Sequence, residues 1–245
     1  MSNSSLINYT KLSPNCNKPR NHAIDTITIH CMAGNLSVET CGAGFASSAR
    51  QASSNYGIGS DGRIALYVDE GNRSWCSGNK ANDNRAITIE VANTVAADPW
   101  PVSDKAYAAL IDLLVDICQR NGIKRLLWQG DKSLIGQVDK QNMTVHRWFQ
   151  AKACPGDWLY SRHGKIAAEV NARLAQKVEE DDMTQEQFNA MMENYLNSLG
   201  EQNVPGWAKA ELQEAIDAGI TDGERPMQLI PRYQSAIIAK RAMKK

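Results

Sequence analysis

The sequence lacks the long apolar segments that a membrane-spanning protein needs. No stretch approaches the roughly 18 consecutive apolar residues of a membrane helix. The polar start, residues 1–5, also lacks the charged and then apolar layout of a secretory signal. We therefore expect a protein with no membrane span and no secretory leader.

Clustered basic charge is absent as well. The 245 residues carry 27 Lys and Arg against 27 Asp and Glu, which gives a formal net charge of zero. Residues 1–178 hold 20 basic against 15 acidic residues and residues 179–245 hold 7 against 12, so the two parts carry +5 and −5. A basic excess this small and dispersed argues against nucleic acid as a partner.

The cysteines form no CxxC pair and no dense disulfide framework. Six cysteines in a chain of this length predict mostly reduced thiols. Cys118 falls in the apolar stripe of an expected helix, where a free thiol packs as a small hydrophobe. The six are Cys16, Cys31, Cys41, Cys76, Cys118 and Cys154.

An acidic run divides the chain into two expected domains. Residues 179–182 are Glu-Glu-Asp-Asp, a solvated and self-repelling stretch between two helical patterns. We predict a first domain at 1–178, an acidic linker at 179–183 and a small helical domain at 184–245. Within the last, helices are expected from Thr184, from Trp207 to Ala218 and from Pro231 to Met243.

The pattern of the first domain predicts an α/β fold. Residues 24–30 and 86–91 alternate apolar and polar side chains, which predicts two strands. Further strands are expected at 56–68, broken by the Asp61-Gly62 turn, and at 123–128. Helices are expected at 103–120, ending before Asn121-Gly122, and at 161–174.

Two histidines and one cysteine have the chemistry of a metal site. His30 ends a strand, and Cys154 follows His146 by eight residues. Two imidazoles and a thiolate suit zinc, and three protein ligands leave a fourth tetrahedral position open for water. Taken singly, each histidine is better explained as a hydrogen-bonded structural residue, and Cys154 as a buried, inert thiol.

The two strands end alike, which strengthens the metal interpretation. One ends Ile-Thr-Ile-His and the other Ile-Thr-Ile-Glu, with His30 and Glu90 on the threonine-bearing face. If the strands share a sheet, both side chains project to one side. A carboxylate beside a metal-bound water is the general base that hydrolysis needs.

Four segments in order resemble the amidase_2 or peptidoglycan-recognition (T7-lysozyme-like) family of N-acetylmuramoyl-L-alanine amidases. They are residues 27–30, residues 53–62, residues 86–93 and residues 146–156, and the resemblance runs from about Ile24 to Leu174. It looks closest to phage endolysins of clostridia and gut Firmicutes. The resemblance implies a mixed central β-sheet flanked by helices.

The resemblance also implies a site and an activity. It implies that His30, His146 and Cys154 bind Zn²⁺, that Glu90 activates water, and that Lys152 stabilises the developing oxyanion. The expected reaction is bacteriolytic hydrolysis of peptidoglycan at the amide between the lactyl group and L-alanine. The enzyme is expected to reach the wall after holin-dependent or lytic release. The alternative is a non-catalytic peptidoglycan-binding module, while the absence of a His-Glu-x-x-His helix disfavours a zinc peptidase of another fold.

Several aromatic and histidine residues stay open at this point. Relatives have an active-site tyrosine where this chain has Ser54, and Tyr56 could reach the site from two residues on. Three tryptophans could line a groove or pack in the core, and two histidines fall outside the matched segments and are expected not to bind metal. These are Trp75, Trp148, Trp158, His22 and His163.

The C-terminal helices weakly resemble a single surface-layer-homology-like repeat. Residues 207–208, 215–216, 219–223 and 232–241 carry the likeness. Such repeats are associated with wall attachment, but they commonly act in threes and only one copy is present. Wall targeting therefore competes with self-association into a homo-oligomer, or with simple packing of the apolar helix face.

Overall fold

The computed structural model describes residues 2–181, 184–230 and 232–243. The chain divides into two compact units, residues 1–178 and residues 179–245. No helix among the described residues is both long and apolar enough to cross a membrane.

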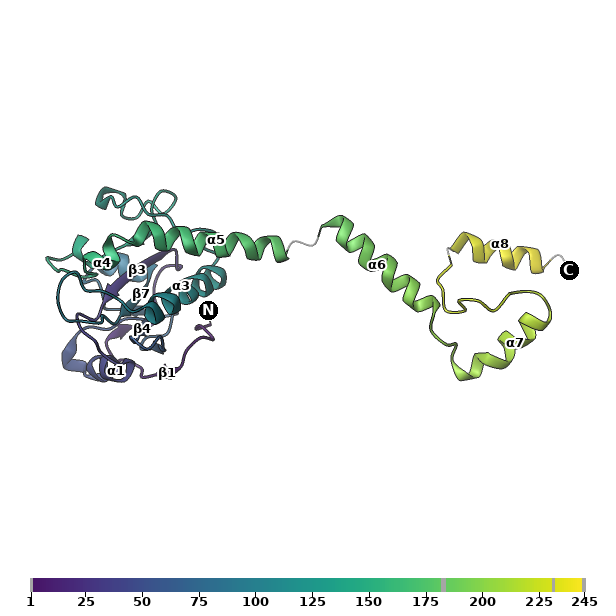
Figure 1. The fold of residues 1–245 in the computed structure, drawn as a ribbon, viewed down its shortest axis with the longest axis horizontal. Helices are drawn as coiled ribbons and strands as arrows, with labels where there is room; N and C mark the ends of the chain where they lie inside the picture. The colour runs from purple at the N-terminus through teal and green to yellow at the C-terminus, as the bar shows by residue number, and fades with distance from the viewer. Residues whose placement is uncertain (1, 182–183, 231, 244–245) are drawn as a thin grey trace. The chain divides into compact units, whose positions relative to one another are not determined.

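A mixed six-stranded sheet forms the centre of the first unit (Figure 1). Its strands run in the order β1-β5-β4-β7-β3-β8, and all neighbours are parallel except the β4–β5 hairpin. The strands are β1 (Tyr9–Thr10), β5 (Ile64–Leu66), β4 (Tyr56–Ile58), β7 (Ala86–Val91), β3 (Thr26–Cys31) and β8 (Met143–Thr144). A separate antiparallel pair joins β2 (Cys16–Asn17) to β6 (Arg73–Ser74).

The two Ile-Thr-Ile strands lie side by side in the middle of this sheet. Ile27 pairs with Ile87, Thr28 with Thr88 and His30 with Glu90. The isoleucines pack against the long helices, while Thr28 bonds through its hydroxyl to Thr144 Oγ1 at 2.8 Å. The alternating pattern therefore separates an apolar face from a polar face that carries the strand-end side chains.

Helices cover the sheet and complete its core. They are α1 (Val38–Ala46), α2 (Lys80–Arg85), α3 (Asp104–Asn121), α4 (Asp157–Tyr160) and α5 (His163–Asp181). The Ser103 side chain caps α3, and Gly122, at φ 69°, ends it in the left-handed conformation that glycine tolerates. Leu110 of α3 and Val170 of α5 are fully buried against the isoleucine face.

The strand expected at residues 123–128 is absent from the described structure. This segment is irregular, because the sheet edge beside β3 is occupied by β8 instead. Side-chain amides replace a strand partner: the Leu127 N–H donates to Asn142 Oδ1 at 2.7 Å, and the Leu126 N–H donates to Asn171 Oδ1 at 2.7 Å. Ile123 and Leu126 are still buried, so the apolar side chains of this segment indicated burial and not pairing with a neighbouring strand.

The helix expected to end at Leu174 continues to Asp181. No glycine or proline follows Gly164 before that point, so nothing in the sequence stops it. Three residues of the acidic run are thus helical, and residues 182–183 of the expected linker lie outside the described residues.

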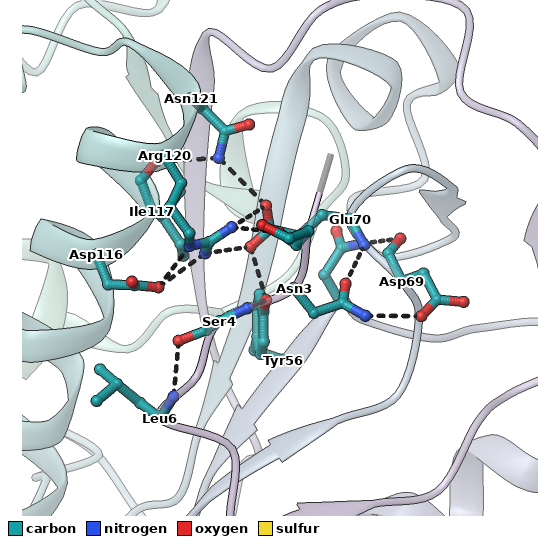
Figure 2. Close-up of polar contacts among 12 residues, drawn as sticks. Asn3, Ser4, Leu6, Tyr56, Asp69, Glu70, Asp116, Ile117, Arg120 and Asn121 are labelled. Carbon is teal, nitrogen blue, oxygen red and sulfur yellow. Dashed lines mark hydrogen bonds and ion pairs between the residues drawn. The ribbon is translucent and has the colours of Figure 1, made fainter.

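A buried polar network ties the N-terminal segment to the sheet and to α3 (Figure 2). The Glu70 carboxylate accepts the Tyr56 hydroxyl at 2.6 Å and two Arg120 nitrogens at 2.6 and 2.8 Å. The Ser4 N–H donates to Tyr56 Oη at 2.9 Å. Burial, followed by the charge of Glu70, raises the pKa of Tyr56, so the phenol stays protonated and donates.

The second unit is helical throughout its regular elements. It contains α6 (Gln185–Gly200), a 3₁₀ turn at Gly206–Ala208, α7 (Lys209–Asp217) and α8 (Arg232–Ala242). Thr184 and Gln187 form a reciprocal capping box at the start of α6. The three expected helices are confirmed within a few residues, and Pro231 lies outside the described residues. Its large apolar side chains, from Phe188 to Met243, are mostly exposed.

Candidate metal centre and active site

The sheet register brings the strand-end side chains into one row. His30 pairs with Glu90, and Glu90 pairs in turn with Gly57 of β4. On the other side, Thr28 pairs with Thr144, so the chain leaving β8 delivers His146 beside His30. The expectation that His30 and Glu90 share a side of one sheet is therefore confirmed.

Three of the expected residues come together at the end of this row. One ligand atom each from His30, His146 and Cys154 lies within 4.8 Å of the other two. Cys154 Sγ lies 3.4 Å from His30 Nδ1, and the two imidazole centroids are 5.0 Å apart. His146 opens a 3₁₀ turn, and the Arg147 N–H donates to Cys154 O at 3.1 Å, which holds the turn and the cysteine together.

The donors in this cluster suit a cation. His30 is fully buried, and burial followed by the neighbouring His146 holds its pKa well below 6.5, so it is neutral. Burial likewise lowers the pKa of His146. Neutral imidazoles and a cysteine are borderline-soft ligands for zinc-like metals. His30, His146 and Cys154 can therefore hold a metal ion.

A second set of donors shares His30. His30, Cys76 and Glu90 also offer ligand atoms within 4.8 Å of one another. Cys76 Sγ donates to Glu90 Oε1 at 3.8 Å, and burial followed by the Glu90 charge raises the pKa of Cys76 well above 9.0. The set with His146 and Cys154 is the better metal site, because it offers two imidazole donors and leaves the Glu90 carboxylate outside the set of ligands.

Glu90 lies beside the cluster with one oxygen unused. Its Oε2 is buried and has no hydrogen-bond partner. Burial, followed by the negative charge of Cys31, raises its pKa to about 8. The side chain can therefore exchange a proton near neutral pH.

A cavity of about 570 Å³ opens over these residues. Glu90, His146 and Cys154 line it, and Lys152 lies exposed at the same cavity. Its other charged lining residue is Arg50. The aromatic lining side chains are Phe45, Trp75 and Trp100.

The tyrosine alternative is wrong. Tyr56 pairs with Ile89 and not with Glu90, so it lies on the opposite face, where its hydroxyl binds Glu70. Neither Tyr56 nor Ser54 lines the cavity, and the Ser54 hydroxyl donates to the Tyr56 carbonyl at 2.8 Å. Residues two apart in a strand do share a face, but the sequence does not say which face of β4 meets the candidate site. The pairing of β4 with β7 decides this.

Of the three candidate groove tryptophans, only Trp75 lines the cavity. Trp148 stacks on Trp128 with centroids 5.0 Å apart, and Trp158 packs edge-on against Tyr107. The two remaining histidines belong to neither set of metal donors. His163 Nδ1 bonds to the Leu159 carbonyl oxygen, and His22 Nδ1 bonds to the Ala23 carbonyl oxygen.

Comparison with known proteins agrees with this geometry. The family model for N-acetylmuramoyl-L-alanine amidase (Amidase_2) matches residues 20–157, more than half of the chain. The chain belongs to this amidase family. Membership makes it an enzyme of the N-acetylmuramoyl-L-alanine amidase class. Among curated protein sequences, none matches this chain.

Solved structures of distant relatives share the amidase fold. The hydrolase AmiA of Staphylococcus aureus, in complex with its ligand, matches with a TM-score of 0.54 at 14% identity, over 73% of this chain and 87% of that one. A mutant of PlyL matches with a TM-score of 0.50 at 14% identity, over 66% and 96%. A mutant endolysin from Bacillus subtilis has a TM-score of 0.49 at 18% identity, over 67% and 99%.

Sequence reasoning missed three neighbours of the candidate site. Gln150 Oε1 lies 3.1 Å from His146 Nε2, and its place four residues after the histidine was the signal that could have found it. Cys76 reaches the site from the irregular segment after β6, and Arg50 from the 3₁₀ turn at Ser48–Arg50. No local pattern in the sequence points to these two.

Proposed function

We propose that this chain is a zinc-dependent N-acetylmuramoyl-L-alanine amidase of the endolysin or autolysin type. It would hydrolyse the amide between the lactyl group of N-acetylmuramic acid and L-alanine in peptidoglycan. The observation that carries the proposal is the convergence of His30, His146 and Cys154 next to a cavity that His146, Cys154 and Glu90 line. Family membership supplies the substrate class.

His30, His146 and Cys154 would hold the zinc ion. When bound, zinc would supply charge stabilisation at the scissile carbonyl and make a neighbouring water more acidic. Cys154 would have to bind as the thiolate. Its hydrogen bond with Cys31 and then burial raise the pKa of this thiol, so metal binding would release a proton.

Glu90 would act as the general base and then the general acid. Its unpartnered Oε2 would take a proton from the attacking water and pass it to the departing amine of L-alanine. Its raised pKa suits both steps, because the group must accept and then release the same proton near neutral pH.

Lys152 would stabilise charge on the substrate. Its exposed ammonium at the cavity would face the negative charge that develops on the lactyl carbonyl oxygen. The flexible stem lets the charged end follow the substrate into the cavity.

We further propose that residues 184–245 form an accessory unit that either targets the wall or pairs chains. The exposed apolar side chains of α6 and α8 support a contact surface. The net negative charge of residues 179–245 gives no attraction to an anionic polymer and so favours pairing.

Metal analysis of matched cysteine variants tests the proposal. We expect one zinc per chain in the wild type and in Cys76→Ser, and loss of stoichiometric zinc in Cys154→Ser. Mass spectrometry of digested wall should show new free L-alanine amino termini with intact glycan. A wild type without zinc, or zinc retained by Cys154→Ser, contradicts the ligand set. Zinc binding without any cleavage would favour a non-catalytic peptidoglycan-binding module.

A further inference from the structure

Gln150 folds back onto one of the proposed metal ligands. Its N–H donates to the His146 carbonyl oxygen at 3.2 Å, closing a turn that returns the side chain to the imidazole. Its Oε1 then lies 3.1 Å from His146 Nε2. The backbone bond sets the spacing of the two residues, and the exposed Gln150 side chain reaches back to the imidazole across that turn.

The loop before α2 supports this placement. The amide end of Gln150 packs against Gly78, where even an added Cβ would collide with the Nε2 and Cδ atoms of Gln150. Gly78 also has φ 71°, a conformation that other residues rarely adopt. With its Nε2 against Gly78, the amide presents its oxygen and not its nitrogen to His146.

That orientation decides which imidazole nitrogen carries the proton. An acceptor oxygen at Nε2 requires a proton there, because a neutral imidazole has one N–H donor and one acceptor nitrogen. The lone pair is then on Nδ1, and Nδ1 becomes the nitrogen that can bind a cation. Histidine ligands commonly depend on such an outer hydrogen bond for tautomer and orientation.

We propose that Gln150 is a positioning residue for the metal centre, which holds His146 in the Nε2–H tautomer. The proposal rests on the zinc-amidase function proposed above. Gln150 would not touch the metal. It would act through His146, and its loss would weaken zinc binding while leaving the fold intact.

The test compares variants that keep or remove the hydrogen-bond acceptor at position 150. Gln150→Met preserves an unbranched side chain without the amide oxygen, and Gln150→Glu preserves an acceptor. Gln176→Met, on the exposed surface of α5, is the matched control. Zinc affinity is measured by competition with a chromogenic chelator, and the His146 tautomer by ¹⁵N chemical shifts in the zinc-free protein.

We expect Gln150→Met to lower zinc affinity by about 10- to 100-fold and to lose the single Nε2–H tautomer. Gln150→Glu should bind zinc at least as tightly as the wild type, and Gln176→Met should match the wild type. Zinc affinity within twofold of the wild type in Gln150→Met, or an unchanged tautomer, overturns the proposal. Failure of the wild type to bind zinc contradicts the proposed function instead, and the tautomer measurement still decides whether Gln150 fixes the proton.

Discussion

The two units of this chain use similar amphipathic helices but bury very different amounts of apolar surface. In the first unit, Leu110 and Ile117 of α3 are fully buried against the sheet. In the second, Phe188 is 47% exposed and Tyr195 57% exposed, although both lie on one capped helix. An apolar stripe therefore becomes core only where another layer covers it.

This difference in apolar burial suits the two units to different roles. A well-packed unit can hold side chains within the narrow geometry that catalysis requires. A unit whose apolar groups remain exposed is better suited to contact with another surface. The proposed functions follow this division, with catalysis in residues 1–178 and surface contact in the second unit, and variants in either unit test it.

The largest effect, a loss of folding stability, is expected at the buried carboxylate of Glu70 in the first unit. Glu70→Gln should lower the free energy of unfolding by about 3 to 5 kcal/mol, because Arg120 would keep its charge without its main partner. Asp112→Asn breaks the exposed pair with Arg173 and should cost less than about 1 kcal/mol. Chemical denaturation of both variants measures the two free energies of unfolding. Equal losses of stability would show that burial does not determine how much an ion pair contributes.

The next effect concerns catalysis in the same unit. Glu90→Gln should leave zinc and fold intact and slow turnover by at least about 100-fold, or about 2.7 kcal/mol, through loss of the general base. Glu39→Gln, on the exposed Glu39–Arg63 pair, is the control and should turn over normally. Kinetics on peptidoglycan measure both, and near-normal turnover in Glu90→Gln would place proton transfer elsewhere.

The pH dependence should follow the same carboxyl group. Glu90 must be deprotonated to accept a proton, so activity should rise with pH through its pKa in the working enzyme. That pKa should lie between the ordinary 4.5 and about 8, because burial raises it and a nearby cation would lower it. The acid limb of kcat/KM locates it, and an unaltered limb in the residual activity of Glu90→Gln would contradict the assignment.

Removing the second unit should have a moderate effect that depends on the substrate. Residues 1–178 alone should keep zinc and cleave a soluble muropeptide at the full rate, but should lyse intact cells several-fold more slowly because a second contact is lost. Sedimentation and wall pull-down separate the causes. A dimer that becomes a monomer supports pairing, whereas an unchanged oligomeric state with lost wall binding supports targeting. Equal lysis by both proteins would remove either role.

The smallest effect is expected within the second unit. Tyr233→Ala removes a side chain that is 63% exposed. It should change the free energy of unfolding of the first unit by less than about 0.5 kcal/mol. Leu110→Ala, at a fully buried position, should cost about 2 to 5 kcal/mol. Calorimetry compares them, and a large shift in Tyr233→Ala would mean that the units depend on each other for stability.

Patterns confined to one strand or helix could be predicted from the sequence. The alternation of the Ile-Thr-Ile segments gave both central strands, and Ser103 with Gly122 marked the ends of α3. The same reasoning failed at residues 123–128, because an apolar run reports burial and cannot say whether a strand partner is present. It also ended α5 too early, since an acidic composition does not by itself stop a helix.

The sequence by itself determined which residues have side chains that are able to bind a metal or transfer a proton. Histidine, cysteine and glutamate stand at the ends of recognisable segments, and that much is local. Only the tertiary structure decided how they meet: the β3–β7 register sets His30 level with Glu90, and the β4 register turns Tyr56 to the far face. Cys76 likewise became a neighbour of the site only through folding. The reason is physical. Strand pairing and loop packing bring together residues that lie far apart along the chain, and their spacing in the sequence does not specify which of them meet.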